Sequence, residues 1–394
     1  MIIRSKRIYC EDDVVDGFLV IEDRVIKAIE GRAADLVADL DVGDKRIIPG
    51  IIDTHNHGTM GYNLIKSVPD VDAEIKAYLK GLAYQGVTGV FPTCDPAIIK
   101  DVARLAKEEQ DGAKIVGIHS EGPYLNRVGE KGIDTGHPDI DMDFVKQMVT
   151  DGAGLLKLVA LAPEIPDATK AIHYLKDNGV RLAFAHSNCD YQEALASFKE
   201  GISVSTHTAN VMSGIHHRRM GGLGACLLDE ELWCEIICDG MHVSDEMMKL
   251  MFKVKPYTKF MMVSDNSSMA GAPIGRYDLR GFLIVNIDEQ GFCLSDTGRL
   301  CGSTKPVLYD IGHLVQALNI PLATCLKMAA LNPAICYGLA ESKGSIKVGK
   351  DADFVIIDDD YQALATYSEG RKVYDCQLDK DLFNPQFMEL YKQD

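Results

Sequence analysis

The sequence predicts an α/β protein, a (β/α)8 TIM-like barrel with a small β-sandwich domain built from both termini. Over the middle of the chain, short apolar runs alternate with stretches of helical pattern, which is typical of βα units. Most of these runs are apolar throughout, as expected for strands that are buried on both faces. Polar side chains with metal-binding chemistry stand where several runs stop, as they do at the rim of a parallel barrel.

The two ends of the chain share a β-rich pattern that differs from the middle. Because 394 residues exceed one ordinary core, we expect a large domain and a smaller one. Residues 1–46 and 344–394 are expected to form the small β-sandwich domain together, and residues 47–343 the metal-dependent barrel. An alternating segment near 276–300 predicts a β-hairpin inserted in the barrel.

The barrel elements follow from apolar runs, helical periodicity and capping residues. We expect Asp190 and Ser244 to begin helices and Gly179 and Gly201 to end them. The expected strands are 47–53, 87–93, 115–119, 156–161, 181–185, 202–206, 235–238 and 260–264. The expected helices are 71–85, 97–110, 141–150, 167–178, 190–200, 244–253, 305–318 and 322–337.

Composition and charge argue against several classes of protein. The net charge of −17 disfavours nucleic-acid binding, which needs a basic face. No apolar run reaches the roughly 20 residues of a membrane-spanning helix, and the first residues do not resemble a signal peptide. The eleven cysteines are scattered without CxxC pairs. We therefore expect a cytoplasmic protein with reduced thiols and no membrane or nucleic-acid partner.

The first candidate metal ligands are His55 and His57, which end the run Ile-Ile-Asp-Thr-His-Asn-His. Residues two apart on a strand point to the same side, so both imidazoles can face the barrel mouth. A surface or turn pair is the alternative for an isolated His-x-His. The preceding apolar strand and the following Gly58 favour the metal site.

Glu121, His186 and His207 each follow a further predicted strand. A carboxylate near the core needs a partner, and a divalent cation supplies one; a salt bridge to a rim Lys or Arg is the alternative. The two histidines end consecutive strands, so they can meet Glu121 on one ion, and two His with one carboxylate is a catalytic ligand pattern. We interpret His119 as a core histidine or one behind the ligands, with ligation as the minor alternative.

Asp265 ends the last predicted strand and is the candidate catalytic base. A bound divalent cation acidifies water, but a group must still take the proton and deliver it to the leaving nitrogen. A carboxylate beside the ion suits this task. The alternative is a capping or turn role in Ser-Asp-Asn-Ser-Ser.

These motifs resemble the amidohydrolase superfamily and, within it, the N-acetylglucosamine-6-phosphate deacetylases. The resemblance covers nearly the whole chain. The tail Gly-Ser-Ile-Lys-Val-Gly-Lys-Asp-Ala-Asp-Phe from Gly344 is common across the superfamily. His-x-Glu-Gly-Pro at His119 and His-x-x-Asn-x-Met at His207 are specific to the deacetylases.

The resemblance implies a role for each matching position. It implies that Glu121, His186 and His207 form the main metal site, and that His55 and His57 bind a second ion present in some members, with Glu121 bridging. It implies that Asp265 is catalytic. The implied substrate-binding residues are His137, Asn210, the backbone of Val211, Arg218 for the phosphate, and His242. In this family some phosphate-side residues cross a homodimer interface, and Arg218 or His217 matches that class.

The chain departs from the family pattern on the substrate side. His216-His-Arg-Arg-Met-Gly-Gly replaces His-His-Arg-Glu-Pro-Gly, and Asn-Val-Met replaces Asn-Ala-Met. Asn-Ser-Ser follows Asp265 where a small Ala is usual, and the loop between Tyr124 and His137 is long. Arg219 beside Arg218 suits an anion or a solvated surface. These changes bear on which sugar is accepted.

We therefore expect a metal-dependent deacetylase of a phosphorylated N-acetyl amino sugar, most simply N-acetylglucosamine-6-phosphate, acting as a homodimer. The expected cofactor is one or two divalent ions, with zinc favoured and iron or manganese as alternatives. N-acetylgalactosamine-6-phosphate or another N-acyl substrate is a neighbouring hypothesis. A barrel that binds without catalysis is a hypothesis of another class, and the complete ligand set argues against it.

Overall fold

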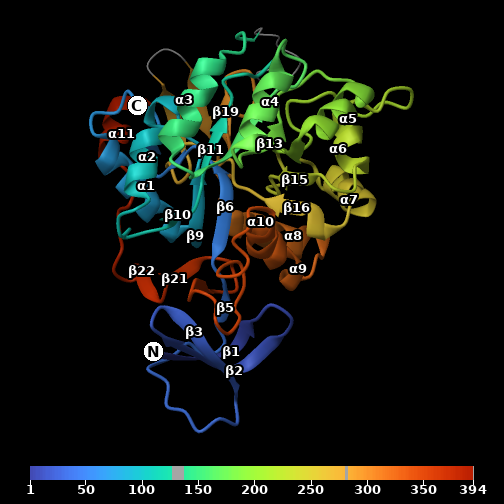
Figure 1. Ribbon diagram of the computed structural model, residues 1–394. Coiled ribbons are helices and arrows are strands. Elements are labelled where there is room, and N and C mark those ends of the chain that lie inside the picture. Colours follow the sequence, from blue (N-terminus) through green and yellow to red (C-terminus); the bar gives the residue numbers. More distant parts are fainter. Residues whose placement is uncertain (127–136, 280–282, 394) are drawn as a thin grey trace.

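The computed structural model describes residues 1–126, 137–279 and 283–393, and its centre is a set of parallel strands surrounded by helices (Figure 1). Within the described residues these strands pair in chain order in two sheets, β10-β9-β6 and β11 to β16. Their bounds are β6 Ile51–Asn56, β9 Val87–Pro92, β10 Lys114–Ile115, β11 Ile118–Glu121, β12 Leu156–Leu161, β13 Arg181–Phe184, β14 Ile202–Ser205, β15 Trp233–Ile236 and β16 Phe260–Met262.

Backbone contacts join the two sheets at both sides. Thr93 bridges to His119 next to β9 and β11, and Asn56 bridges to Asn266 next to β6 and β16. The amide of Asp265 donates to the carbonyl of His55 over 2.9 Å. The carboxyl ends of the first and last strands therefore lie side by side, where the candidate ligands stand.

The first strand differs from the prediction of a single strand over 47–53. β5 (Arg46–Pro49) pairs with β1 and β20 in another sheet, and β6 starts only at Ile51. Pro49 has no amide proton to donate, which interrupts the ladder. A Cβ on Gly50 would lie 2.2 Å from the Thr88 hydroxyl oxygen, so the chain can change sheets there only with glycine.

Helices follow the parallel strands as the periodicity predicts. Asp190 forms a capping box with Glu193, and the Ser244 hydroxyl accepts from the amide of Met247, which confirms both predicted N-caps. The helices are α1 Val71–Tyr84, α2 Ile99–Leu105, α3 Met142–Gly152, α4 Ala168–Asp177, α5 Tyr191–Glu200, α6 Gly221–Leu228, α7 Asp245–Val254, α8 Val307–Leu318, α9 Leu322–Leu326 and α10 Asn332–Cys336.

Helix α6 was not predicted, because its sequence Gly-Gly-Leu-Gly-Ala-Cys-Leu-Leu has weak helix propensity. Every residue of α6 except Leu228 is buried. A Cβ on Gly222 would meet the Phe184 ring at 2.8 Å, so glycine permits this close approach to β13. Tertiary packing therefore overrides the local preference of this segment.

The two ends of the chain share one sheet, in the order β22-β21-β20-β5-β1-β2-β3, with β4 beside β1 (Figure 1, bottom). Its strands are β1 Ile2–Tyr9, β2 Val14–Glu22, β3 Val25–Gly31, β4 Leu40–Asp41, β20 Phe354–Ile357, β21 Ala363–Ser368 and β22 Arg371–Asp375. Its own apolar core includes Ile3, Leu19, Ile47, Phe354 and Tyr367.

The predicted hairpin insertion is present as β17 (Gly275–Asp278), β18 (Ile284–Ile287) and β19 (Cys293–Ser295). The last described residues pack on it: β23 (Lys392–Gln393) pairs with β17, and Phe387 of α11 (Pro385–Tyr391) lies in its core with Tyr277. These C-terminal residues therefore extend the hairpin sheet and not the sheet shared by both termini. No helix among the described residues has the length and apolar character needed to cross a membrane.

Glu11 ties the two termini together. Its carboxylate accepts from Lys347 at 2.7 Å, Lys350 at 3.3 Å and the Ser345 hydroxyl at 2.5 Å. Hydrogen bonds from Lys347 and Ser345 lower the pKa of Glu11 from 4.5 to about 2. The segment that begins at Gly344 therefore has a structural role in this chain, which is to hold the N-terminal strands.

We expect Glu11→Gln to lower the free energy of unfolding at pH 7 by about 1 kcal/mol, a screened charge-assisted interaction. Because the folded pKa is depressed, this contribution is present above pH 4.5 and is lost as the pH falls toward 2. Urea denaturation at pH 7 and near pH 3 measures the difference. Glu22→Gln, which removes an exposed carboxylate 3.9 Å from Lys27, is the control. An equal loss at both pH values would contradict the prediction.

Candidate metal centre

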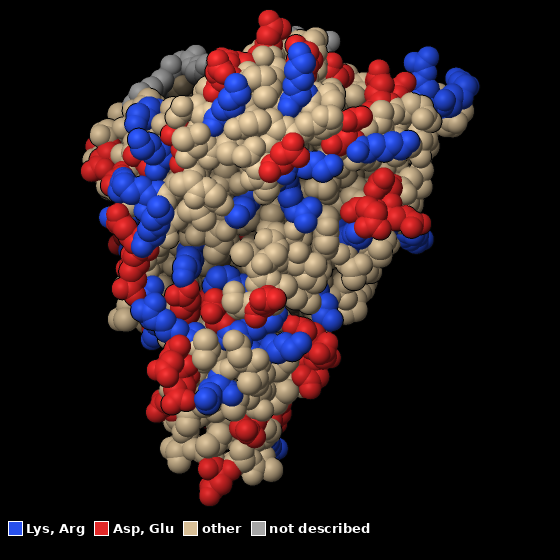
Figure 2. Space-filling view, viewed as in Figure 1, with Lys and Arg blue, Asp and Glu red and all other residues tan. Residues whose placement is uncertain are grey.

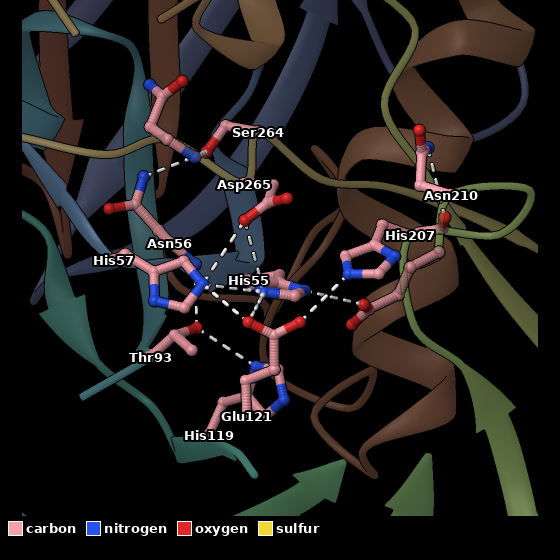
Figure 3. A network of polar contacts seen from close by, with 12 residues as sticks. His55, Asn56, His57, Thr93, His119, Glu121, His207, Asn210, Ser264 and Asp265 are labelled. Carbon is pink, nitrogen blue, oxygen red and sulfur yellow. Dashed lines mark hydrogen bonds and ion pairs between the residues drawn. The ribbon is translucent and has the colours of Figure 1, made fainter. Parts of the chain in front are cut away.

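The six residues predicted at strand ends converge on one site, and Figure 3 shows five of them: His55, His57, Glu121, His207 and Asp265. His55 lies in β6 and His57 directly after it, and Glu121 ends β11; the other three follow β13, β14 and β16. His186, His207 and Asp265 have positive φ angles of 44°, 29° and 48°. Such angles cost of order 1–3 kcal/mol each for residues other than glycine, so the surrounding fold must impose these turns.

One oxygen of Glu121 meets two imidazoles. Glu121 Oε1 lies 3.0 Å from His186 Nε2 and 3.0 Å from His207 Nε2, and these nitrogens are 3.1 Å apart. His207 is nearly buried, with 4% of its surface exposed. The three ligand atoms form a compact triangle at the centre of the rim.

The other carboxylate oxygen meets the His-x-His pair. Glu121 Oε2 lies 3.1 Å from His57 Nε2 and 3.7 Å from His55 Nε2, and the two nitrogens are 3.1 Å apart. Asp265 Oδ1 lies 3.4 Å from His55 Nε2 and 3.3 Å from His57 Nε2. Glu121 therefore stands between two clusters and offers one oxygen to each (Figure 3).

The donor set fits divalent cations. Ligand atoms about 2.1 Å from a tetrahedral ion lie about 3.4 Å from one another, close to the spacing in both clusters. In each cluster, two imidazole nitrogens and a carboxylate oxygen face one another. One or two protons cannot give every one of these atoms a hydrogen bond, whereas a cation at the centre can accept a lone pair from all of them. His55, His57 and Glu121 would hold one ion, and Glu121, His186 and His207 another.

Electrostatics keep the catalytic candidate ionised. Burial raises the pKa of the Asp265 carboxyl, but the positive charge of His55 and contacts with His57 outweigh it and hold that pKa below its usual range. Burial likewise lowers the pKa of His57, yet Asp265 and Glu121 raise it to about 9. The site is therefore built to hold positive charge between carboxylates, as a cation centre requires.

His119 lies behind the candidate ligands, next to His55 and Thr93. Its Nδ1 is 3.0 Å from the Thr93 hydroxyl, and its ring packs edge-on against His55 with centroids 4.6 Å apart. Its Nε2 has no hydrogen-bond partner among the described residues. Burial, followed by the charge of His55, holds the pKa of His119 well below its usual value, so this ring is neutral.

Glu235 is a further candidate site residue, to which the sequence pattern assigned no role. It is fully buried on β15, and its Oε2 accepts from His55 Nδ1 at 3.0 Å while its Oε1 accepts from the Thr54 hydroxyl at 3.3 Å. A carboxylate behind a histidine ligand fixes the tautomer that leaves Nε2 free for a metal. A charged residue inside the apolar run Trp-Cys-Glu-Ile-Ile was the available signal.

We expect Glu235→Gln to weaken metal binding at the His55–His57 cluster about 10- to 100-fold, because the amide orients His55 without charge. Metal titration after chelator dialysis measures the affinity of each site. Glu231→Gln, whose carboxylate is exposed just before β15, is the matched control. Unchanged affinity in Glu235→Gln, or an equal loss at the His186–His207 cluster, would count against this role.

Glu164 is a second missed residue, in the Ala-Pro-Glu motif after β12. Its carboxylate accepts from the amide of Asn188 at 2.7 Å, the Ser187 hydroxyl at 2.8 Å and Asn126 Nδ2 at 2.9 Å. The amide of Asn126 also donates to the carbonyl of His186 over 3.2 Å. These bonds fix the turn on which His186 stands.

A cavity of about 250 Å³ opens over the ligands and contains part of the predicted substrate site. Asn210, Val211 and His242 line it beside Asp265, and Asp239 accepts from His242 Nδ1 at 2.7 Å, which orients that ring. The other lining residues are His57, Glu121, His186, His207, Ser267, Arg299, Leu300 and Gly302. A second cavity of about 1210 Å³ adjoins it under the hairpin insertion.

The structure does not bring His137 or Arg218 into this site. His137 is exposed and contacts the carbonyl of Pro138, and Arg218 lies in the exposed segment 214–220. The segment lies between β14 and α6 along the chain. Most of the long loop singled out between Tyr124 and His137, residues 127–136, lies outside the described residues.

An α/β fold that carries histidines and carboxylates arranged for divalent cations at the ends of parallel strands defines a metal-dependent hydrolase. A family model described as the amidohydrolase family matches residues 46–388. The chain belongs to the amidohydrolase family.

Similar proteins include deacetylases of phosphorylated N-acetyl amino sugars. The chain is 30% identical to an N-acetylglucosamine-6-phosphate deacetylase of Vibrio furnissii, over 91% of this chain and 90% of that protein. It is 31% identical to an N-acetylgalactosamine-6-phosphate deacetylase of Escherichia coli O157:H7, over 94% and 98%. The solved deacetylase mutant of Mycobacterium smegmatis, in complex with N-acetyl-D-glucosamine-6-phosphate, is 27% identical, with a TM-score of 0.82 over 95% of this chain and 99% of that chain. The fold is thus of the TIM-barrel type found in these deacetylases.

Proposed function

We propose that this protein removes acetate from a phosphorylated N-acetyl amino sugar, most simply N-acetylglucosamine-6-phosphate, leaving glucosamine-6-phosphate. The observation that carries the proposal is the position of Asp265, which lines the 250 Å³ cavity and whose Oδ1 lies within 3.4 Å of Nε2 of both His55 and His57. The deacetylase relatives match nearly the whole chain. A binding module without catalysis has no need of a base at this position.

The side chains have distinct tasks in this reaction. A divalent cation, when bound, polarises the acetyl carbonyl and lowers the pKa of water toward about 7. Asp265 takes the proton of the attacking water and gives it to the sugar nitrogen as the C–N bond breaks. Asn210, the backbone of Val211 and His242 orient the sugar from the cavity wall.

N-acetylgalactosamine-6-phosphate is the second candidate substrate. The relative named for that activity is 31% identical, against 30% for the N-acetylglucosamine-6-phosphate deacetylase of Vibrio furnissii. The two sugars differ only at the C4 hydroxyl, and the chain departs from the family pattern on the substrate side, at Val211 and after Asp265. Either epimer would use the same metal and base.

Acetate release from the two epimers, with and without phosphate, tests the proposal. We expect N-acetylglucosamine-6-phosphate to have the highest kcat/KM of the four compounds. A higher value for the galactosamine epimer would support the second candidate. No acetate from any of the four compounds, in protein loaded with Zn²⁺, Fe²⁺ or Mn²⁺, would support the binding module.

Zinc is the cofactor we propose, at one or two positions, because two imidazoles and a carboxylate with open positions suit it. Iron and manganese accept the same ligands. Glu121 offers an oxygen to each cluster, which supports two ions. Metal analysis of protein that is purified without added metal tests which ion is bound and how many.

The assembly, the location and the domain boundaries are also proposals. We propose a homodimer in the cytoplasm. The exposed segment 214–220, with Ile215 41% and Met220 36% exposed beside Arg218, supports a subunit interface. Acidic and basic residues are interspersed on the face in Figure 2, in keeping with a partner that is not a nucleic acid.

We further propose a closed (β/α)8 barrel over 47–343 and a β-sandwich from 1–46 and 344–394, with the C-terminal helix docked on the barrel's hairpin.

A further inference from the structure

We propose that Arg299 binds the phosphate of the substrate from within the same chain. This inference rests on the proposed function and names a residue to which the resemblance assigned no role. Arg299 lines both the cavity over the ligands and the larger cavity beside it. Among the described residues that line either cavity, Arg299 is the sole Lys or Arg.

The guanidinium is available for a ligand. Arg299 is half-buried, and within residues 1–126, 137–279 and 283–393 its side chain makes no hydrogen bond or ion pair. Its neighbour Asp296 does not neutralise it, because both Asp296 oxygens accept from Arg276, at 2.9 and 2.8 Å. A half-buried cation without a partner beside a cavity indicates a site for an anion.

The backbone around Arg299 is fixed. Its amide donates to the Ser295 hydroxyl at 3.1 Å, and its carbonyl accepts from the Ser295 amide at 2.8 Å, which continues the hairpin of β19. Leu300 and Gly302 then run along the cavity wall toward Ser303, whose amide donates to the carbonyl of Asp265 over 3.2 Å. Arg299 therefore lies four residues before Ser303, which contacts the candidate base, and at the start of the segment that leaves the hairpin.

The chemistry of the substrate matches this placement. The phosphate is on C6 and the acetamide is on C2, at opposite ends of the sugar ring. With the acetyl group beside Asp265 and the ligands, the phosphate must point along or out of the cavity. The planar guanidinium suits two phosphate oxygens. Within one chain, Arg218 is exposed on another loop and does not line either cavity, so Arg299 is the cation that the chain itself supplies there. A contact from Arg218 would come across the proposed dimer interface.

The test compares substrates with and without phosphate in Arg299→Met. We expect the KM for N-acetylglucosamine-6-phosphate to rise about 30-fold or more, with kcat within about 3-fold, because a charge-assisted contact is lost. The kcat/KM for unphosphorylated N-acetylglucosamine should stay within 3-fold, and Arg299→Lys should restore part of the affinity. Arg32→Met, which removes an exposed cation after β3, is the charge-matched control.

Binding to metal-free protein separates this inference from the proposed function. By calorimetry, glucosamine-6-phosphate should bind wild type at least 10-fold more tightly than Arg299→Met, whether or not acetate is released. If Arg299→Met leaves the KM and this affinity unchanged, or if only Arg218→Met raises the KM, the inference is overturned. If the wild-type protein releases no acetate, and Arg299→Met still binds glucosamine-6-phosphate more weakly than wild type, the proposed function fails and the anion site stands.

Discussion

Replacing Asp265 by Asn is expected to reduce kcat by about 10⁴-fold, the upper end of the range for one acid–base group. The effect is large because one carboxylate serves two steps: it accepts the proton of the attacking water and delivers it to the leaving nitrogen. The amide of Asn can do neither. The contacts of Asp265 with His55 and His57 hold its pKa below the usual range, so the base is ionised at neutral pH.

The metal should remain in the Asp265→Asn protein. Glu121, His186 and His207 make their cluster without Asp265, so metal analysis should find that ion at wild-type stoichiometry. The KM should change little, since Asn keeps the size of the side chain. Asp143→Asn, exposed in the first turn of α3, is the control. Turnover within 10-fold of wild type would remove Asp265 from the mechanism.

Replacing Glu121 by Gln is expected to empty both metal positions and to reduce activity to near the background rate. Each Glu121 oxygen lies 3.0 to 3.1 Å from a histidine nitrogen of a different cluster. An amide puts an NH₂ group in place of one oxygen and removes the charge that both cations need. We expect less than one tenth of the wild-type metal content after dialysis.

The variant His57→Asn separates the two clusters. It should lower metal content only at the His55–His57 pair and leave the ion at His186 and His207, so a partial loss contrasts with the full loss in Glu121→Gln. Metal content and acetate release are measured on the same samples. Wild-type metal content in Glu121→Gln would show that the carboxylate does not bridge.

Part of the candidate site could be predicted because its candidate ligands follow apolar strands. His55, His57, Glu121, His186, His207 and Asp265 each stand at such an end, and the ends of parallel strands meet. Glu235 and Glu164 could not be assigned in this way, since each acts on a ligand from a different strand. The pattern around them shows only an acidic residue, without its partner.

The expectations for His137 and Arg218 came from resemblance alone, and within a single chain both lie outside the described cavities. The substrate end of the site is built from loops, whose conformation depends on contacts that no local pattern encodes. Arg299 illustrates the reverse case. In the sequence Arg299 follows an ordinary hairpin turn. Only in the folded hairpin does it line the cavity beside the candidate ligands.

The sequence by itself determined most of the order of strands and helices, the contribution of both termini to one small sheet, and the six groups at the strand ends. It could do so because burial on both faces selects apolar strands, and because metal ligands need few residue types. Only the tertiary structure decided that Glu121 stands between two clusters, that Glu235 holds His55, and that Arg299 faces the cavity. These depend on distances between segments far apart in the chain, which packing of the whole molecule fixes.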